Sequence, residues 1–188
     1  MVGFLDDVNP TRRNQKFCGL PILGGREQLE ALKNMNISHI VFAFGNGEAR
    51  LKLAEIIRAQ GFYLASAVHP KAIIADSTYI GPGTVIAAGA VVNPGTRIGD
   101  NVIRNTGASV DHECIIEDGV HICPGASLGG RVTVGRAAWV GIGSTIKDRV
   151  RIGGGAIIGA GTVVLKDIPD MVSAYGVPAR IRKRILRI

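Results

Sequence analysis

Aromatic side chains are scarce in this sequence: they make up 5% of its 188 residues, although 46% of the residues are hydrophobic. A core with so few aromatic rings has to be filled by Ile, Val and Ala, which is typical of a narrow β structure. No apolar run approaches the roughly 18 residues of a transmembrane helix, so we expect no membrane span. The absence of a charged-then-apolar leader predicts a protein that is not exported.

Cysteine is also rare, and its distribution limits the redox chemistry. The three cysteines, Cys18, Cys114 and Cys123, form no CxxC pair and cannot all be paired within one chain. Reduced thiols are typical of the cytoplasm, so we expect a cytoplasmic protein. No base is placed to activate Cys114 or Cys123 as a nucleophile, and we interpret both as small packed residues.

The formal net charge of +7 is concentrated at the carboxyl end. Five positive residues fall within the last nine: Arg180, Arg182, Lys183, Arg184 and Arg187. No aromatic residues alternate with them, as they do in many nucleic-acid-binding segments, so we expect no nucleic-acid partner.

A six-residue repeat runs without a break from Ile74 to Pro169. Fifteen of its sixteen anchor positions are β-branched or leucine: Ile74, Ile80, Ile86, Val92, Ile98, Val110, Ile116, Ile122, Leu128, Val134, Val140, Ile146, Ile152, Ile158 and Val164. The residue four places after an anchor is usually small: Thr78, Thr84, Ala90, Thr96, Ala108, Cys114, Ala126, Ala138, Ser144, Ala156 and Thr162. The residue directly after an anchor is often glycine: Gly81, Gly99, Gly129, Gly135, Gly141, Gly153 and Gly159.

A period of six fits neither a helix nor a simple two-sided strand. It fits a solenoid in which each hexad forms one short strand and a corner. We expect the anchors to point inward and the glycines to take corner positions where φ is positive. Three hexads make one triangular coil, and coils stack at roughly 4.8 Å, so sixteen hexads give about five coils with a height of roughly 25 Å.

Arg104 is the one anchor that is not aliphatic. An unpaired charge in the core would cost several kcal/mol. We therefore predict that its guanidinium reaches a carboxylate or an opening at the surface, or that the strand turns it outward.

The first 70 residues have a different pattern, in which apolar segments alternate with helical spacing. We predict strands over residues 2–6, 39–44 and 62–68, helices over 26–34 and 48–60, and a loop around Pro10, Gly19 and Pro21. Alternating strands and helices imply a small parallel α/β unit. The predicted domains are residues 1–70, the repeat at 71–170, and a closing segment with the basic tail at 171–188.

The repeat resembles that of the hexapeptide-repeat acyltransferases, whose coil is a left-handed parallel β-helix. The unit before it resembles the amino-terminal domain of the sugar acetyltransferases that modify amino sugars and sialic acid. The matching segments are Gly3-Phe4-Leu5-Asp6-Asp7, Ala43-Phe44-Gly45-Asn46 with Arg50, Val68-His69-Pro70, Asn105-Thr106-Gly107, His112-Glu113, His121 and Gly176-Val177-Pro178-Ala179. The implied fold is mainly β, with a left-handed parallel β-helix preceded by a small, incomplete Rossmann-like α/β domain.

One departure from the family concerns the beginning of the chain. Family members carry a further strand, a glycine-rich turn of the G-x-G-G-x type and a helix before the strand that matches Gly3-Phe4-Leu5. In those proteins the turn brings backbone N–H groups close to the nucleotide. Three explanations are open: a shortened chain, a start that lies upstream, or an acceptor that binds differently.

The resemblance also implies roles for individual residues. His112 is the expected general base and Glu113 its orienting carboxylate. The expected donor-binding residues are His121, Gly130, Gly141, Ile142 and Ala160, with Gly130 as an oxyanion donor. The expected acceptor-binding residues are Asp6, Asp7, Gly45, Asn46 and Asn105. The basic tail is a candidate for contacting the phosphates of coenzyme A.

The implied function is that of a homotrimeric, acetyl-CoA-dependent acetyltransferase in cell-surface glycan biosynthesis, with a nucleotide-linked 4-amino sugar as the favoured acceptor. Two alternatives remain: a sialic acid O-acetyltransferase, and a non-catalytic β-helix that binds sugar nucleotides or acts as a scaffold. A zinc enzyme on this coil would need three histidines, whereas the repeat holds only His112 and His121, so we expect no metal.

Overall fold

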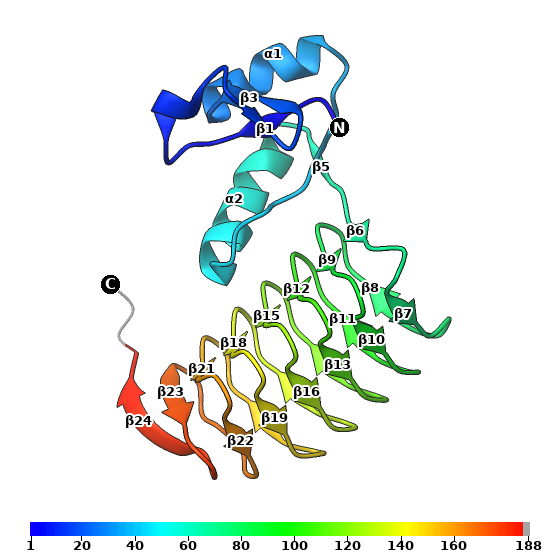
Figure 1. Cartoon of the computed structure of the whole chain (residues 1–188), viewed down its shortest axis with the longest axis vertical. Coiled ribbons are helices and arrows are strands. Elements are labelled where there is room, and N and C mark those ends of the chain that lie inside the picture. Colours follow the sequence, from blue (N-terminus) through cyan, green and yellow to red (C-terminus); the bar gives the residue numbers. More distant parts are fainter. Residues whose placement is uncertain (186–188) are drawn as a thin grey trace. The chain divides into compact units, whose positions relative to one another are not determined.

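The computed structural model describes residues 1–185, and Arg187 of the basic tail lies outside them. The chain forms two compact units, Met1–His39 and Ile40–Ile188. Figure 1 shows the elements of both units in chain order. No described helix has the length and apolar character needed to cross a membrane.

The first unit is built on a small mixed sheet. Its elements are β1 (Phe4–Leu5), the 3-10 helix η1 (Pro10–Arg12), β2 (Lys16–Phe17), β3 (Leu20–Gly24), the 3-10 helix η2 (Arg26–Gln28) and α1 (Leu29–Asn34). The strand order is β1-β3-β2, with β1 parallel and β2 antiparallel to β3. The helix predicted at 26–34 is present as η2 and α1, but a small parallel Rossmann-like domain is not confirmed.

The predicted loop around Gly19 contains a hairpin that the sequence prediction missed. Strands β2 and β3 are joined by Cys18 and Gly19, which have φ values of 47° and 79°. Positive φ at both central residues is the geometry that favours a tight hairpin. Pro21, which suggested a loop, lies near the start of the central strand β3, where it pairs with Lys16.

The second unit begins with short elements that lead into the repeat. These are β4 (His39–Ile40), α2 (Gly47–Ala59), β5 (Tyr63–Leu64) and β6 (Ala67–Val68). Of the strand predicted at 39–44, only the first two residues form a strand, β4. The strand predicted at 62–68 is divided into β5 and β6. Because β6 pairs with β9, the coil structure starts just before the predicted boundary at residue 70.

The repeat forms a parallel β-helix of two-residue strands. Its strands are β7 (Ile73–Ile74), β8 (Tyr79–Ile80), β9 (Val85–Ile86), β10 (Val91–Val92), β11 (Arg97–Ile98), β12 (Ile103–Arg104), β13 (Ser109–Val110), β14 (Ile115–Ile116), β15 (His121–Ile122), β16 (Ser127–Leu128), β17 (Thr133–Val134), β18 (Trp139–Val140), β19 (Thr145–Ile146), β20 (Arg151–Ile152), β21 (Ile157–Ile158) and β22 (Val163–Val164). Strands β23 (Val172–Tyr175) and β24 (Arg180–Arg184) then form an antiparallel pair that closes the coil end.

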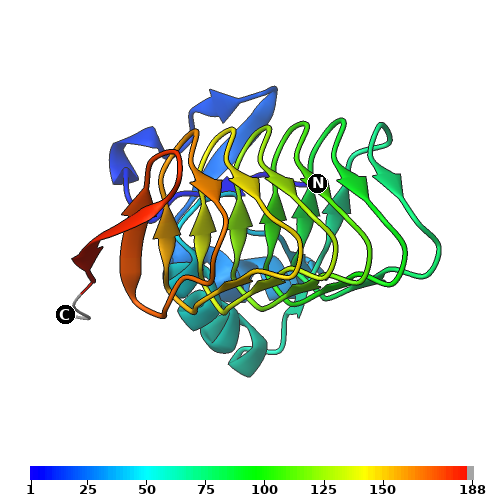
Figure 2. The same cartoon turned by 90° about the horizontal axis from the view of Figure 1, so that it is seen from below.

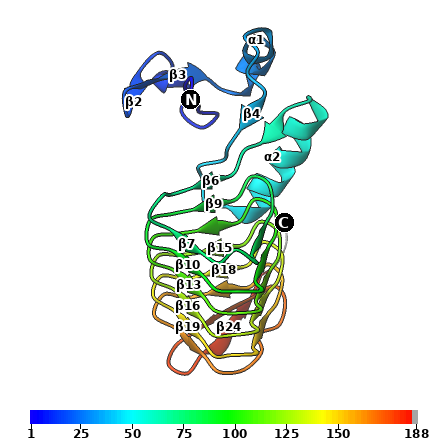
Figure 3. The same cartoon turned by 90° about the vertical axis from the view of Figure 1, so that its right-hand side faces the viewer.

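Three sheets form the faces of the coil, and Figures 2 and 3 show their strands stacked one coil upon the next. We call the sheet from β6 and β9 to β24 sheet I, the sheet from β7 to β22 sheet II, and the sheet from β8 to β20 sheet III. Within the repeat, each strand pairs with the strand 18 residues away; Val91, for example, pairs with both Ile73 and Ser109. Three hexads per coil, as predicted, place every residue beside the one 18 positions further on.

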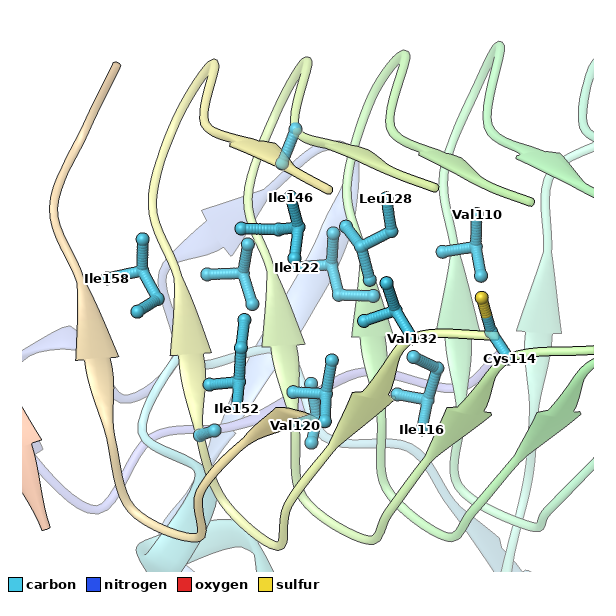
Figure 4. Close-up of a cluster of buried hydrophobic side chains, with 14 of the residues drawn as sticks. Val110, Cys114, Ile116, Val120, Ile122, Leu128, Val132, Ile146, Ile152 and Ile158 are labelled. Atoms are coloured by element: carbon cyan, nitrogen blue, oxygen red, sulfur yellow. The ribbon is translucent and has the colours of Figure 1, made fainter. Parts of the chain in front are cut away.

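The anchors fill the interior, as the repeat predicted. Ile98, Val110 and Ile122 are completely buried, and the small residues Ala108 and Ala126 pack between such anchors. Figure 4 shows this narrow core, in which branched aliphatic side chains from all three faces meet. Burying apolar surface contributes about 25 cal/mol per Å², so this continuous stack is the main source of stability for the coil.

The expected role of the repeat glycines is wrong in one respect. Positive φ occurs three residues after an anchor, as at Gly83 (77°) and Gly107 (65°). The glycines predicted for that role, such as Gly135, lie earlier in the hexad and have no positive φ. A Cβ on Gly135 would lie 2.5 Å from the backbone nitrogen of Gly154 in the next coil. These glycines are needed because successive coils approach closely at the corners.

Arg104 points into the core, which corrects the expected relief of its charge. The side chain is completely buried, and its Nη2 donates to the carbonyls of Val91 at 2.6 Å and Ala108 at 2.7 Å. Its Nε and Nη1 have no hydrogen-bond partner among the described residues. Burial lowers the pKa of Arg104 to about 10, so the charged form weakens the folded state at neutral pH.

Arg50 of α2 is a second buried arginine, with a much fuller set of partners. It donates to five carbonyls: those of Phe44, Gly45, Asn101, Gly119 and Val120, at distances from 2.6 to 3.3 Å. Burial lowers its pKa to about 10 as well. Its bonds connect α2 and the segment before it to two successive coils of the β-helix.

We predict opposite effects when either arginine is replaced by methionine of similar size. Arg104→Met removes a poorly satisfied buried cation and should raise the free energy of unfolding by about 1–3 kcal/mol. Arg50→Met leaves several buried carbonyls without a donor and should lower it by roughly 3 kcal/mol. Urea unfolding of both variants beside the unmodified protein measures the difference. A large loss of stability in Arg104→Met would mean that its two carbonyl bonds outweigh the cost of burial.

Candidate active site

His112 and Glu113 lie at the corner between sheets II and III, in the turn that joins β13 to β14. His112 Nδ1 lies 3.2 Å from Glu113 Oε2, and about half of each side chain is exposed. Adjacent residues on a flat strand would point to opposite faces. The turn brings them together because Glu113 has a φ of 55°, and this fits the predicted position at a corner.

The partners of Glu113 define the proton positions on His112. Hydrogen bonds from Arg131 and then His112 lower the pKa of Glu113, so its carboxylate is ionised at neutral pH. An ionised carboxylate only accepts hydrogen bonds, so Nδ1 of His112 must be the donor. In a neutral ring the lone pair is then on Nε2, which is the tautomer of a general base.

Gly130 lies one coil beyond His112, directly against its imidazole. A Cβ on Gly130 would lie 2.5 Å from His112 Nε2 and 2.8 Å from its Cε1. Gly130 has no positive φ, so the backbone itself would accept another residue. The glycine is needed to leave room for the ring.

Asp111 and Arg131 also belong to this corner, and sequence reasoning missed their roles. Asp111 Oδ1 accepts from the backbone N–H of His112 at 2.7 Å and from Asn93 Nδ2 at 2.9 Å. Arg131 Nε donates to Glu113 Oε2 at 2.7 Å. The available signal was spacing: Asn93 and Arg131 are each one coil, 18 residues, from the residue that they bind.

A shallow surface hollow of about 350 Å³ opens beside the His112 ring. It is lined by Asp111, His112, Gly129, Gly130, Arg131, Lys147, Asp148 and Arg149. The lining is polar and carries both signs of charge, which suits a polar substrate better than an apolar one.

His121 lies elsewhere, on the outer side of sheet I. Its ring packs 4.2 Å from that of Trp139, and its Nδ1 lies 3.2 Å from the carbonyl of Gly45. Burial lowers the pKa of His121, which favours a neutral ring. Its Nε2 is buried without a hydrogen-bond partner among the described residues. The structure thus joins His121 to Gly45 and does not place it at the His112 corner.

Four further predicted residues lie at the corner between sheets I and II. Asn105, Gly141, Ile142 and Ala160 come from three coils, in turns that follow strands of sheet I. Asn105 Oδ1 accepts from the backbone N–H of Thr106, while Ile142 and Ala160 are exposed. Within one chain, therefore, these residues and the His112–Glu113 pair occupy different corners of the coil.

The expected acceptor-binding residues before the repeat have structural contacts of their own. Asp6 accepts from the backbone of Val8 and Asn9 and pairs with Arg12 at 3.1 Å. Asp7 pairs with Arg26 at 2.7 Å. Asn46 caps α2, because its Oδ1 accepts from the backbone N–H of Ala49 at 2.9 Å. An acceptor role for these side chains stays a prediction.

Cys114 and Cys123, the two cysteines of the coil, are buried thiols. Burial raises the pKa of Cys114, and it raises the pKa of Cys123 to about 11, so neither is an activated thiolate. Within residues 1–185, no group of three His, Cys, Asp or Glu side chains is arranged to hold a metal ion.

Several proteins of known activity are similar to this chain. GDP-perosamine N-acetyltransferase of Escherichia coli O157:H7 is 36% identical over 141 residues, which are 73% of this chain and 60% of that protein. The structure of PerB from Caulobacter crescentus in complex with CoA and GDP-perosamine is 38% identical with a TM-score of 0.91, covering 96% of this chain and 84% of that one. The acetyltransferase domain of PglB from Neisseria gonorrhoeae is 37% identical with a TM-score of 0.89, covering 96% and 86%. No protein-family model matches the chain.

The coil, its 18-residue register and these similarities together define the class of protein. The chain belongs to the hexapeptide-repeat sugar acetyltransferases. The predicted family is confirmed, and so is the left-handed parallel β-helix. The chain spans 60% of the length of the curated relative from Escherichia coli.

Replacing Gly130 with alanine should displace the His112 ring without unfolding the coil. The new Cβ would overlap the imidazole, which is half exposed and free to rotate away. A crystal structure of Gly130→Ala should show the His112–Glu113 contact broken. Gly154→Ala is the matched control, because its Cβ would lie at least 3.5 Å from its neighbours and its φ is not positive. An unmoved His112 ring in Gly130→Ala would contradict this role for the glycine.

Proposed function

We propose that the protein is an acetyl-CoA-dependent N-acetyltransferase that acts on the amino group of a nucleotide-linked amino sugar, with a 4-amino sugar favoured. The observation that carries the proposal is the exposed His112 ring, oriented by an ionised Glu113 and seated against Gly130. A related structure holds CoA and GDP-perosamine, which supports this donor and this class of acceptor.

In the proposed reaction His112 acts as the general base. Its Nε2 takes a proton from the acceptor amine as the amine nitrogen attacks the thioester carbonyl of acetyl-CoA. Glu113 holds the Nδ1 proton and stabilises the imidazolium that forms. The backbone N–H of Gly130 is the proposed donor to the oxyanion of the tetrahedral intermediate. The intermediate collapses with loss of the CoA thiolate, which the imidazolium can protonate, so no covalent enzyme intermediate is needed.

We propose a homotrimer in which the β-helices of two neighbouring copies share each site. The base lies at the corner between sheets II and III, while Gly141, Ile142 and Ala160 lie at the corner between sheets I and II. Threefold packing can bring the first corner of one copy beside the second corner of the next. Large apolar side chains exposed on the coil, including Ile73, Tyr79, Ile115 and Ile142, support such packing.

The proposed setting is the cytoplasm, in a pathway that supplies modified sugars for cell-surface glycans. The three cysteines are all free, and two of them are buried in the coil, which fits a reducing compartment. An N-acetylated nucleotide sugar is an activated donor, so the proposed product suits a later glycosyl transfer.

The test of the function is CoA release with acetyl-CoA and a panel of acceptors. We expect turnover with a nucleotide-linked 4-amino sugar and none with free sialic acid. His112→Ala should lower kcat by on the order of 10²–10⁴-fold with little change in donor affinity. Glu113→Gln should lower kcat by a smaller factor. It should also move the acidic limb of the pH–rate profile to lower pH, because the His112 ring loses a neighbouring negative charge. Near-normal turnover in His112→Ala would remove it from the mechanism.

The trimer predicts a sedimentation mass of three times the 19.8 kDa chain. It also predicts complementation between two inactive variants, His112→Ala and Ile142→Arg, when they are unfolded and refolded together. Random mixing in a shared-site trimer should restore about a quarter of the unmodified activity, since each site needs one intact corner from each of two copies. A stable monomer, or no recovery in mixed trimers, would contradict the shared site.

A further inference from the structure

Glu113 offers one carboxylate oxygen to two different residues. Arg131 Nε donates to Oε2 at 2.7 Å, and His112 Nδ1 lies 3.2 Å from the same atom. The shorter of the two contacts is therefore the one with arginine. The charge that faces the imidazole is that of a carboxylate already engaged by a guanidinium.

The backbone at this corner favours the arrangement. Glu113 and Arg131 both have left-handed backbone conformations, with φ values of 55° and 61°, and they lie one coil apart. The corresponding positions at the corner between sheets I and II are glycines: Gly89, Gly107, Gly125, Gly143 and Gly161. Non-glycine residues are strained in this conformation. Glu113 and Arg131 nevertheless adopt this conformation, and their side chains meet in a 2.7 Å contact beside His112.

We infer that Arg131 is a positioning residue for the catalytic base: it holds the carboxylate of Glu113 at His112 Nδ1 and offsets its negative charge, so that the imidazole remains unprotonated to lower pH. This inference rests on the proposed function of His112. The hydrogen bond from Arg131 is the first cause that lowers the pKa of Glu113, which agrees with a carboxylate that is ionised at neutral pH.

The other charged residues around His112 nearly cancel, so Arg131 and Glu113 dominate the electrostatic effect on its ring. Asp111 on the same coil accepts from the backbone of His112 and from Asn93. Lys147, Asp148 and Arg149 of the coil beyond line the same hollow. These four residues carry two positive and two negative charges and so nearly balance. Loss of Arg131 would expose the ring to an uncompensated Glu113.

A matched ion pair elsewhere on the coil separates this role from an ordinary surface contact. Arg136 Nη1 lies 3.4 Å from Asp118 Oδ2, again one coil apart. The side chains of Arg136 and Arg131 are almost equally exposed, at 48% and 49%. No histidine contacts the Arg136–Asp118 pair among the hydrogen bonds of the described residues. Arg136→Gln therefore reproduces the loss of a surface ion pair without a change at the base.

The experiment is the pH profile of kcat/KM at low ionic strength, where exposed charges are least screened. Arg131→Gln should move the acidic midpoint up by about half a pH unit, which is the size expected for one exposed ion pair. Arg131→Lys keeps the positive charge, so its acidic midpoint should lie close to that of the unmodified protein. Arg136→Gln should leave the midpoint unchanged. Glu113→Gln should move it in the opposite direction, which no general loss of folding would do.

A second readout does not depend on turnover. Proton NMR titration of the His112 ring in each variant should show the same order of midpoints. An unchanged midpoint in Arg131→Gln, or a uniform fall in activity at every pH, would overturn the inference. If His112→Ala were fully active, the proposed function would fail instead, while the ring titration would still decide whether Arg131 acts on the imidazole.

Discussion

The backbone ladder between coils is the constraint on which the rest of the structure depends. Each strand donates to the strand one coil away, so every residue lies beside the one 18 positions further on. Aliphatic anchors therefore stack on aliphatic anchors, and the corner glycines face backbone at short distance. The same ladder places Gly130 against His112 and Arg131 beside Glu113, so the proposed active site is a local use of the rule that builds the core.

The two buried arginines show how differently this interior treats a cation. Arg50 reaches carbonyls from two coils and from the segment before α2, and those carbonyls satisfy its guanidinium. Arg104 stands where the repeat calls for an aliphatic anchor and finds two carbonyls for a single nitrogen. Burial lowers the pKa of both, yet one connects parts of the fold while the other interrupts a continuous apolar stack.

The repeat made the coil and the His112–Glu113 corner predictable, because a strict period converts sequence spacing directly into position. Arg131 was within reach of the same reasoning, since it lies one coil beyond Glu113. The first 70 residues have no such period, and there local propensity was a weaker guide. The hairpin around Gly19 depends on positive φ at Cys18, which is uncommon for a non-glycine residue. The inward course of Arg104 depends on carbonyls whose positions only the folded coil defines.

The register has a consequence for how such a chain can change in length. Insertion or loss of one complete coil keeps every anchor in the interior and every hexad on its own face, whereas a change that is not a multiple of six residues moves the following anchors out of the interior. The proposed base, its carboxylate and the glycine against its ring occupy only the coils of His112 and Gly130. A whole coil nearer the amino end of the repeat, such as the one from β7 to β9, can therefore be gained or lost in an 18-residue step while the base, its carboxylate and its glycine keep their geometry. The number of coils and the geometry of the proposed base are, in that sense, independent properties of the fold.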